Sequence, residues 1–225
     1  CGMGRVNDDR TARALLSRIS EPVDSYIVGL VHEHGAVEAV ERISRASSAP
    51  GGKAERYRAR LETADPEADL DRVREVGGRL IVPGDLEWPS QLDALGERAP
   101  LALWARGTVD LRLSCLRSVS IVGARAATTY GRDVAATLGA DLASSGWAVV
   151  SGGAFGIDSA AHSGALAVRG VTVAALACGV DVAYPPRHAD LFARIAADGL
   201  LLSEVPPGAA PHRTRFLVRN RLIAA

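Results

Sequence analysis

Residues 118–179 have the sequence SVSIVGARAATTYGRDVAATLGADLASSGWAVVSGGAFGIDSAAHSGALAVRGVTVAALACG, and this stretch decides the fold of the chain. Short apolar runs at Val119–Val122, Ala148–Val150 and Val171–Leu176 predict buried strands. Between them, residues 130–145 and 157–168 carry apolar side chains at helical spacing. Strands that alternate with helices form parallel sheets covered on both faces. We therefore expect an α/β fold with an extended Rossmann-like, doubly wound, mostly parallel sheet.

The same alternation continues on both sides of this stretch. Residues 190–197 predict another helix, and Leu200–Leu202 predicts a fourth strand. Upstream, Arg79–Val82 and Leu101–Trp104 predict two short strands. In the predicted helix at residues 130–145, apolar side chains recur at intervals of four and predict an amphipathic helix; they are Tyr130, Val134, Leu138 and Leu142.

The N-terminal third of the chain predicts a small bundle of short helices. Ser20-Glu21-Pro22 predicts a helix start, because a capping hydroxyl precedes a proline in the first turn. Gly35 predicts the end of that helix, and Ser47–Gly52 predicts a break. We therefore expect two units, a helical domain with its linker at residues 1–72 and a Rossmann-type domain at residues 73–225.

Positive charge is concentrated near the C-terminal end of the sequence. The chain has 225 residues and balances 26 Lys and Arg against 26 Asp and Glu, so its net charge does not indicate a nucleic-acid binder. Residues 205–225, however, hold arginines and no carboxylate. Such a segment is either a candidate anion site or a solvated surface loop. The arginines are Arg213, Arg215, Arg219 and Arg221.

The cysteine content and the hydropathy of the sequence indicate the cellular compartment of the protein. The three cysteines lack CxxC spacing and favour neither a disulfide framework nor a zinc site, so we expect a cytoplasmic protein without a metal. The longest apolar run, Val171–Val180, is too short to cross a bilayer. The sequence begins at Cys1 and ends on an apolar stretch after a basic cluster. We therefore expect a Rossmann-type domain truncated at its C-terminal end.

Two glycine-containing loops follow the first two strands of the deciding stretch. Residues 123–131 contain Arg125 and Thr128, and residues 151–158 contain Gly152–Gly153. In a parallel sheet, ligands bind beyond the carboxyl ends of the strands, where glycines let backbone amides approach an anion. The loops predict a phosphate-binding surface, although tight packing alone would also explain the glycines. Neither loop matches a dinucleotide fingerprint or a P-loop, so we expect no cofactor.

Three further side chains near these loops have alternative interpretations. Asp158 and His162 lie four residues apart, as a hydrolytic pair would, but a helix cap with a local histidine partner is the interpretation we favour. Asp181 is interpreted as structural, because a carboxylate repels phosphate. Tyr184 either stacks on a base or packs in the protein.

The segment at residues 211–221 interleaves arginines with one aromatic residue, as a groove for single-stranded nucleic acid requires. We expect Arg219 and Arg221 to hold phosphates, and Phe216 to stack or pack. Asn220 is expected to meet a base edge or to cap a helix. Arg213 and Arg215 complete the basic part of this predicted surface.

Five motifs, in this order, resemble the bacterial DNA-processing protein A family (DprA/Smf). They are SIVGARAATTYGR, VVSGGAFGIDSAAHSGAL, ALACGVDVAYPP, GLLLSEVPPGAAP and FLVRNRLIAA. The helical N-terminal part resembles the family's sterile-alpha-motif-like domain. The resemblance implies a protein that binds and protects single-stranded DNA and helps to load the RecA recombinase in natural transformation and recombination. It also implies a homodimer of the full-length protein. The short apolar runs predict no membrane partner.

The resemblance assigns roles to individual residues. It places the phosphate-gripping arginine at Arg125, the backbone cradle at Gly152–Gly153 and the basic RNR motif at residues 219–221. Phe155 stands where the family has arginine or lysine, which removes a cation and adds a ring to the expected DNA-binding set. Leu217 replaces a proline of the family.

An enzymatic interpretation comes from the phosphoribohydrolases of the lysine-decarboxylase-like group, which bind a nucleoside monophosphate on a similar sheet. Their PGGxGTxxE loop carries a catalytic glutamate, whereas the only glutamate of this chain after Ser118 is Glu204. A pure interaction module for RecA or other partners is a third interpretation. We expect a binding protein that is not an enzyme, because no placed glutamate, nucleophile arrangement or metal cluster stands out.

Overall fold

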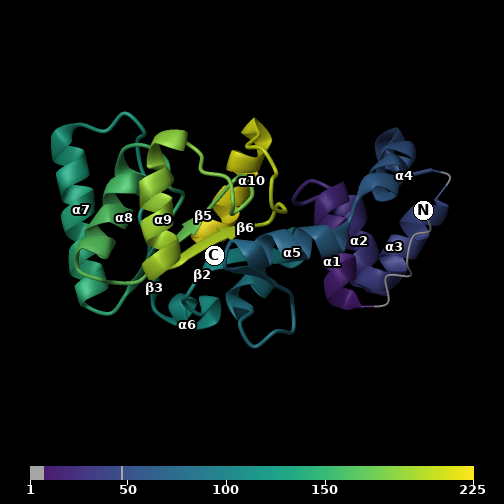
Figure 1. Ribbon diagram of the computed structural model, residues 1–225, viewed down its shortest axis with the longest axis horizontal. Coiled ribbons are helices and arrows are strands. Elements are labelled where there is room, and N and C mark those ends of the chain that lie inside the picture. Colours follow the sequence, from purple (N-terminus) through teal and green to yellow (C-terminus); the bar gives the residue numbers. More distant parts are fainter. Residues whose placement is uncertain (1–7, 47) are drawn as a thin grey trace.

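The computed structural model describes residues 8–46 and 48–225 (Figure 1). At one end of the molecule, short helices gather around a core that includes Leu16, Ile27 and Ile43. These helices are α1 (Asp9–Ile19), α2 (Ser25–His34), α3 (Ala36–Arg45) and α4 (Ala54–Thr63), and the turn η1 (Pro50–Gly52) precedes α4. Helix α5 (Pro66–Glu75) leads from them to the sheet.

The predicted helix start at Ser20 is wrong. Ser20 is instead the C-terminal cap of α1, and its hydroxyl donates to the Leu16 carbonyl at 2.7 Å. Helix α2 begins after Asp24, whose carboxylate accepts the Tyr26 amide. Serine and proline occur at both ends of helices, so the local pattern alone did not show whether Ser20 begins or ends a helix. Gly35 ends α2 as predicted, with a φ of 80°.

The sheet has the strand order β1-β2-β6-β5-β4-β3. Strands β3 to β6 run parallel, whereas β1 and β2 add an antiparallel hairpin-like edge next to β6. The sheet is therefore mostly parallel, as predicted. The strands are β1 (Gly78–Ile81), β2 (Leu103–Gly107), β3 (Ser118–Ser120), β4 (Ala148–Ser151), β5 (Thr172–Ala175) and β6 (Leu200–Ser203).

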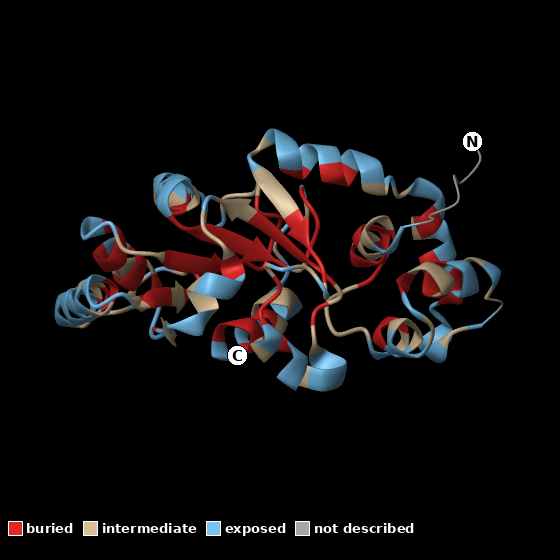
Figure 2. Ribbon diagram, turned by 90° about the horizontal axis from the view of Figure 1, so that it is seen from below, coloured by how far each residue is buried: buried red, intermediate tan, exposed pale blue. Residues whose placement is uncertain are grey.

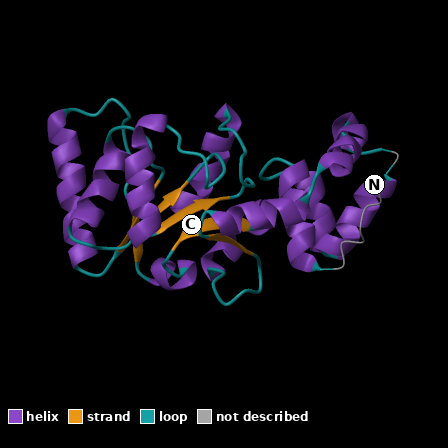
Figure 3. Ribbon diagram, viewed as in Figure 1, coloured by secondary structure: helices purple, strands orange, loops and turns teal. Residues whose placement is uncertain are grey.

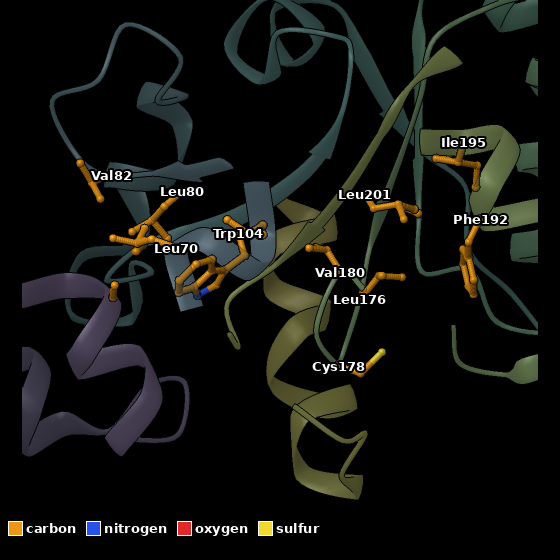
Figure 4. Packing of buried hydrophobic residues seen from close by; sticks show 14 of the residues in the cluster. Leu70, Leu80, Val82, Trp104, Leu176, Cys178, Val180, Phe192, Ile195 and Leu201 are labelled. Carbon is orange, nitrogen blue, oxygen red and sulfur yellow. The ribbon is translucent and has the colours of Figure 1, made fainter. Parts of the chain in front are cut away.

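Helices cover both faces of the sheet (Figure 3). Alternate strand residues point to opposite faces. Trp104 and Leu201 pack with α5, α8 (Ile157–Ala167) and α9 (Ala189–Asp198). Leu103 and Leu200 pack on the other face with η2 (Ser90–Arg98), α6 (Leu111–Leu116) and α10 (Arg213–Ala224). Figure 4 shows the Trp104 indole beside Leu70 of α5. The remaining elements are α7 (Thr129–Ser144) and η3 (Pro186–His188).

The large apolar residues that predicted an amphipathic α7 mostly face solvent. Tyr130 is 78%, Val134 46% and Leu138 46% exposed. The buried face of α7 consists of small residues, and a side chain at Gly139 would overlap the Ala161 carbonyl of α8. The two helices cross so closely that only small residues fit between them.

The run Val119–Val122 is less buried than predicted. Strand β3 is at the edge of the sheet and pairs only with β4 among the described residues. Ile121 is buried, but Val122 is 60% exposed. An edge strand has a neighbouring strand on one side only, so an apolar run at this position is only partly buried. In Figure 2 the inner strands of the sheet are buried, whereas the outer helix faces are exposed.

The N-terminal helices pack directly against the sheet. The predicted division at residue 72 falls inside α5, whose Leu70 and Val73 pack on the sheet. The Trp104 Nε1 on β2 donates to the Ser17 Oγ on α1 at 3.2 Å. In the described part of the chain, no helix combines the length and apolarity that a bilayer crossing needs.

Candidate nucleic-acid interface

The loops that leave the carboxyl ends of β3 and β4 pack directly on each other. Ala124 accepts the Ile157 amide at 3.3 Å. A side chain at Gly156, where φ is 83°, would overlap the carbonyl oxygens of Ala124 and Arg125, and one at Gly123 would overlap Ile157. These two glycines are therefore explained by the close approach of the loops, the alternative that the sequence left open.

The expected anion cradle on the second loop is occupied by a carboxylate of the chain itself. Asp158, which is 6% exposed, accepts the amides of Gly152 at 3.2 Å and Ala154 at 3.4 Å. The Gly152 amide is thus bonded inward. Asp158 braces the loop and does not cap α8, whose N-terminal cap is Gly156.

His162 does not pair with Asp158. Its Nδ1 lies 2.7 Å from the Thr172 Oγ1 on β5, and the ring is fully buried. Burial, followed by the nearby Arg219 charge, lowers the pKa of His162 to about 3. A neutral, inaccessible imidazole bonded to threonine has no part in a hydrolytic pair, and the predicted local partnership with Asp158 is also wrong.

Arg219 lies inside the molecule rather than on a groove. The residue is 6% exposed, and its Nη1 donates to the carbonyl oxygens of Gly152, at 2.9 Å, and Ala175. Its Nε has no hydrogen-bond partner in the described part of the chain. Burial lowers the pKa of Arg219, and the charge of Asp158 opposes this effect. Arg219 therefore joins the ends of β4 and β5, which corrects its predicted role as a surface phosphate ligand.

Arg221 and Arg215 are also engaged by carboxylates. Both carboxylate oxygens of Glu204 bind Arg221, one of them at 2.6 Å, and both side chains are 7% exposed. Arg215 binds Glu21 through two contacts of 2.7 and 2.9 Å. Because Glu204 already binds Arg221 inside the protein, the guanidinium does not lie on an open groove, and its expected contact with a phosphate stays a prediction. The ion pair also makes Glu204 unavailable as a general base.

Arg125 keeps an exposed guanidinium. Its Cζ lies 5.6 Å from the centre of the Phe216 ring on α10. Two carboxylates of the neighbouring loops are bonded elsewhere, because Asp158 binds loop amides and Asp181 binds Arg72 and the Gly208 amide. Asp181 is structural, as predicted. Arg125 has no ion pair with any described carboxylate and is held by an aromatic face.

Two pairs of aromatic rings involve the second loop and the segments next to the loops. The ring centres of Tyr184 and Phe216 lie 5.7 Å apart, and those of Phe155 and His188 lie 4.5 Å apart. Phe155 is 42% and Tyr184 43% exposed. His188, whose Nδ1 lies 3.0 Å from the Gly153 oxygen, was not singled out from the sequence. Its position just after the Tyr-Pro-Pro turn was the available signal.

The remaining predicted residues lie at the start of α7, on α10 and in the second loop. The Thr128 hydroxyl accepts the Gly131 amide at 3.1 Å as the cap of α7 and keeps its hydrogen for an outside acceptor. Arg213 and Asn220 are exposed on α10. Gly153 has a φ of 69°, and a side chain there would overlap the Phe192 ring. No group of histidine, cysteine and acidic residues suited to a metal ion occurs among the described residues.

A comparison with family models identifies the chain. The model described as DNA recombination-mediator protein A matches residues 79–225. The chain belongs to this family. The family predicted from the five motifs is thereby confirmed.

Known relatives agree with this assignment. A DprA-type DNA processing protein of Mycobacterium tuberculosis is 47% identical over 229 residues, covering 96% of this chain and 59% of that protein. DNA processing protein DprA of Bacillus subtilis is 35% identical over 155 residues, covering 69% of this chain and 52% of that protein. The chain thus spans less than two thirds of the length of these curated relatives.

Two solved structures share the fold. The X-ray structure of DprA from Streptococcus pneumoniae matches with a TM-score of 0.72 and 25% identity over 98% of this chain and 75% of that chain. The structure of DprA from Helicobacter pylori, described for its single-stranded DNA binding mode, matches with a TM-score of 0.56 and 32% identity over 64% of each chain. The predicted α/β fold is confirmed.

Proposed function

We propose that this chain binds single-stranded DNA on the rim formed by Arg125, Phe155, Tyr184 and Phe216. The observation that carries the proposal is the exposed Arg125 guanidinium, which has no carboxylate partner among the described residues. It lies over the half-buried Phe216 ring, and the exposed Tyr184 ring lies beside Phe216. An arginine binds phosphate oxygens, and rings stack on bases of any sequence. Single-stranded DNA offers both groups in alternation.

Other rim residues add polar contacts in this proposal. Arg213 supplies a second exposed cation, and Asn220 supplies an amide. The Thr128 hydroxyl and the Gly153 turn lie at the loops themselves. Arg215, Arg219, Arg221 and Gly152 act indirectly, because their polar groups are bonded within the protein.

The whole protein is proposed to be a recombination mediator. Membership of the DNA recombination-mediator protein A family supports this role. The resemblance further supports protection of incoming DNA, loading of RecA and a homodimer. The cysteine pattern supports a cytoplasmic location. Among the described residues, neither of the two candidate groups is placed for nucleotide hydrolysis, because His162 is buried and Glu204 is ion-paired. We therefore propose a binding role without catalytic turnover.

The proposal is tested by fluorescence anisotropy with short labelled oligonucleotides across a salt series. We expect binding with little sequence preference that weakens steeply with salt, because phosphate contacts release condensed counterions. Affinity that stays flat across the series would contradict the proposal. In a parallel sample with a nucleoside monophosphate, release of free base above a no-protein control would favour the phosphoribohydrolase interpretation.

For the RecA role, the full-length protein is added to single-stranded DNA coated with single-strand-binding protein. We expect faster RecA filament growth than without the protein. Unchanged growth would contradict the mediator role while leaving DNA binding intact.

A further inference from the structure

Arginine–carboxylate contacts tie the N-terminal helices to the loops around the rim. On α5, the Arg72 Nε donates to the Asp181 carboxylate at 2.8 Å, and Asp181 in turn accepts the Gly208 amide at 2.7 Å. On α1, the Arg18 Nη2 donates to the Pro207 carbonyl at 2.8 Å. The loop that leads from β6 into α10 is therefore fixed from the helical part of the chain.

The contact between Glu21 and Arg215 reaches the rim most directly. The Arg215 Nε and Nη2 donate to the two carboxylate oxygens of Glu21 at 2.7 and 2.9 Å, across 194 residues of sequence. The Arg215 Nη1 donates to the Ala210 carbonyl at 2.8 Å. Such two-pronged pairs fix direction as well as distance. Arg215 is thereby held in place, with 17% of its side chain exposed.

Arg215 belongs to the first turn of α10. Among the described residues, the other polar side-chain contact of this turn joins the His212 Nδ1 and the Thr214 Oγ1 at 2.8 Å, within the turn itself. The N-terminal cap, His212, makes no side-chain bond to a helix amide. The next residue, Phe216, carries the ring that lies under Arg125 and beside Tyr184. A shift of this turn would move the ring away from both.

We propose that Glu21 is a positioning residue through which the helical domain sets the DNA-binding rim. By holding Arg215, Glu21 fixes the first turn of α10 and keeps the Phe216 ring under Arg125. This inference rests on the proposed DNA binding. It gives the helical domain a role in affinity although its own residues do not line the rim.

Electrostatics and positioning predict effects of opposite sign. Removal of a carboxylate near a polyanion strengthens binding through Coulomb interactions, and so would release of Arg215 to bind a phosphate. Loss of positioning weakens binding. The sign of the change therefore decides between these roles.

The test measures oligonucleotide affinity for wild type, Glu21→Gln and the control Glu62→Gln, which removes an exposed carboxylate from α4. We expect Glu21→Gln to bind about fivefold more weakly, within the range of coupling between distinct sites, while Glu62→Gln binds as tightly as wild type or slightly tighter. In a Phe216→Ala background, Glu21→Gln is expected to have no further effect. A general loss of structure would instead add to the Phe216→Ala defect.

A charge-swapped variant covers the case in which Glu21→Gln unfolds. Glu21→Arg combined with Arg215→Glu restores an ion pair with the same net charge, and we expect affinity within about twofold of wild type. Equal or tighter binding by a folded Glu21→Gln, or no recovery in the swapped variant, overturns the positioning role. If wild type itself fails to bind DNA, the proposed function fails first.

Discussion

The four arginines near the C-terminal end illustrate how the partner of a charge determines its role. Arg213 is exposed, Arg215 is paired with Glu21, and Arg221 is paired with Glu204. Within the described part of the chain, Arg219 binds backbone carbonyls alone. A guanidinium that is already bonded to a carboxylate has to break that pair before it binds a phosphate, so local charge density overstates the cations available to DNA.

Replacement of Arg125 by alanine is expected to weaken DNA binding by about 1.5–3 kcal/mol, the range for hydrogen bonds to a charged group. The salt slope should fall by about one, as for the loss of one phosphate contact. The melting temperature should barely change, because the guanidinium is exposed. Oligonucleotide titrations and thermal unfolding of the same sample measure both effects.

The matched control is Arg112→Ala on α6, which removes an exposed arginine from the helix that precedes β3. It should bind DNA as wild type does. If Arg112→Ala and Arg125→Ala lose affinity equally, Arg125 acts through general charge and not at a site.

His162 predicts a pH dependence of stability. Its pKa of about 3 in the folded protein lies below the usual value near 6.5, so the unfolded chain binds an extra proton between these values. The free energy of unfolding should therefore fall as the pH drops below about 6.5, by about 1.4 kcal/mol per pH unit from this group. Urea unfolding between about pH 7 and pH 5 measures the slope.

In His162→Gln this contribution to the slope should disappear, while His32→Gln, at an exposed position on α2, should keep it. Equal slopes in wild type and His162→Gln would show that the buried imidazole is not the source.

At the scale of elements, the end of a helix can depart from the residue preferences of its sequence motif. Helix α8 ends in a Schellman motif, in which the Arg169 amide bonds to the Leu166 carbonyl and the Gly170 amide to the Ala165 carbonyl. Glycine usually occupies the left-handed position of this motif. Here Arg169 occupies it with a φ of 56°.

The substitution Arg169→Gly is expected to stabilise the protein by about 0.5–1 kcal/mol, because relief of the left-handed strain exceeds the added freedom of the unfolded chain. Val168→Gly, one residue earlier at a φ of −102°, should destabilise by a similar amount. Denaturant midpoints with unchanged m-values test both. A less stable Arg169→Gly would mean that the arginine side chain makes a contact worth more than the strain.

The regular elements of the sheet could be predicted because their signals are local. The apolar runs at β4, β5 and β6 and the spacing in α8 were enough to place them within a few residues. The buried face of α7 was not predictable in this way. Its larger apolar residues are exposed, because the close crossing with α8 admits only small side chains such as Gly139.

The site could be predicted only where its signals are local in the sequence. The motif at the end of β3 indicated Arg125, which is exposed there. That the Gly152 amide is already bonded to Asp158 depends on how the loop folds back on α8, which glycine spacing does not reveal. The partners of Arg215 and Arg221 likewise lie far away in sequence or in another loop. DNA contacts at the rim stay a prediction.

At the scale of the whole molecule, buried charge pairs connect parts that the sequence separates. Arg221 on α10 binds Glu204 after β6 and donates to the Arg98 carbonyl of η2 at 2.7 Å. Burial raises the pKa of Glu204, and Arg221 opposes this rise. The pair holds three segments together, but it also costs desolvation of both charges.

Removal of one partner should therefore be far more harmful than removal of both. Arg221→Ala is expected to lower the free energy of unfolding by about 3–5 kcal/mol, because Glu204 is left buried and unpaired. Arg221→Met combined with Glu204→Leu should recover most of this loss. Chemical denaturation of the three proteins tests the expectation. A stable Arg221→Ala that has lost only DNA affinity would restore the phosphate-binding role of Arg221.

Because Arg219 joins the ends of β4 and β5 from inside the molecule, a cell that carries a substitution there is expected to lose the polypeptide to its proteases. A genetic screen for recombination defects would then score Arg219 and Arg125 alike. An immunoblot of the same strains would distinguish them, since only the Arg125 allele should accumulate at the normal level. Phenotype alone would assign a DNA contact to a residue that maintains protein abundance.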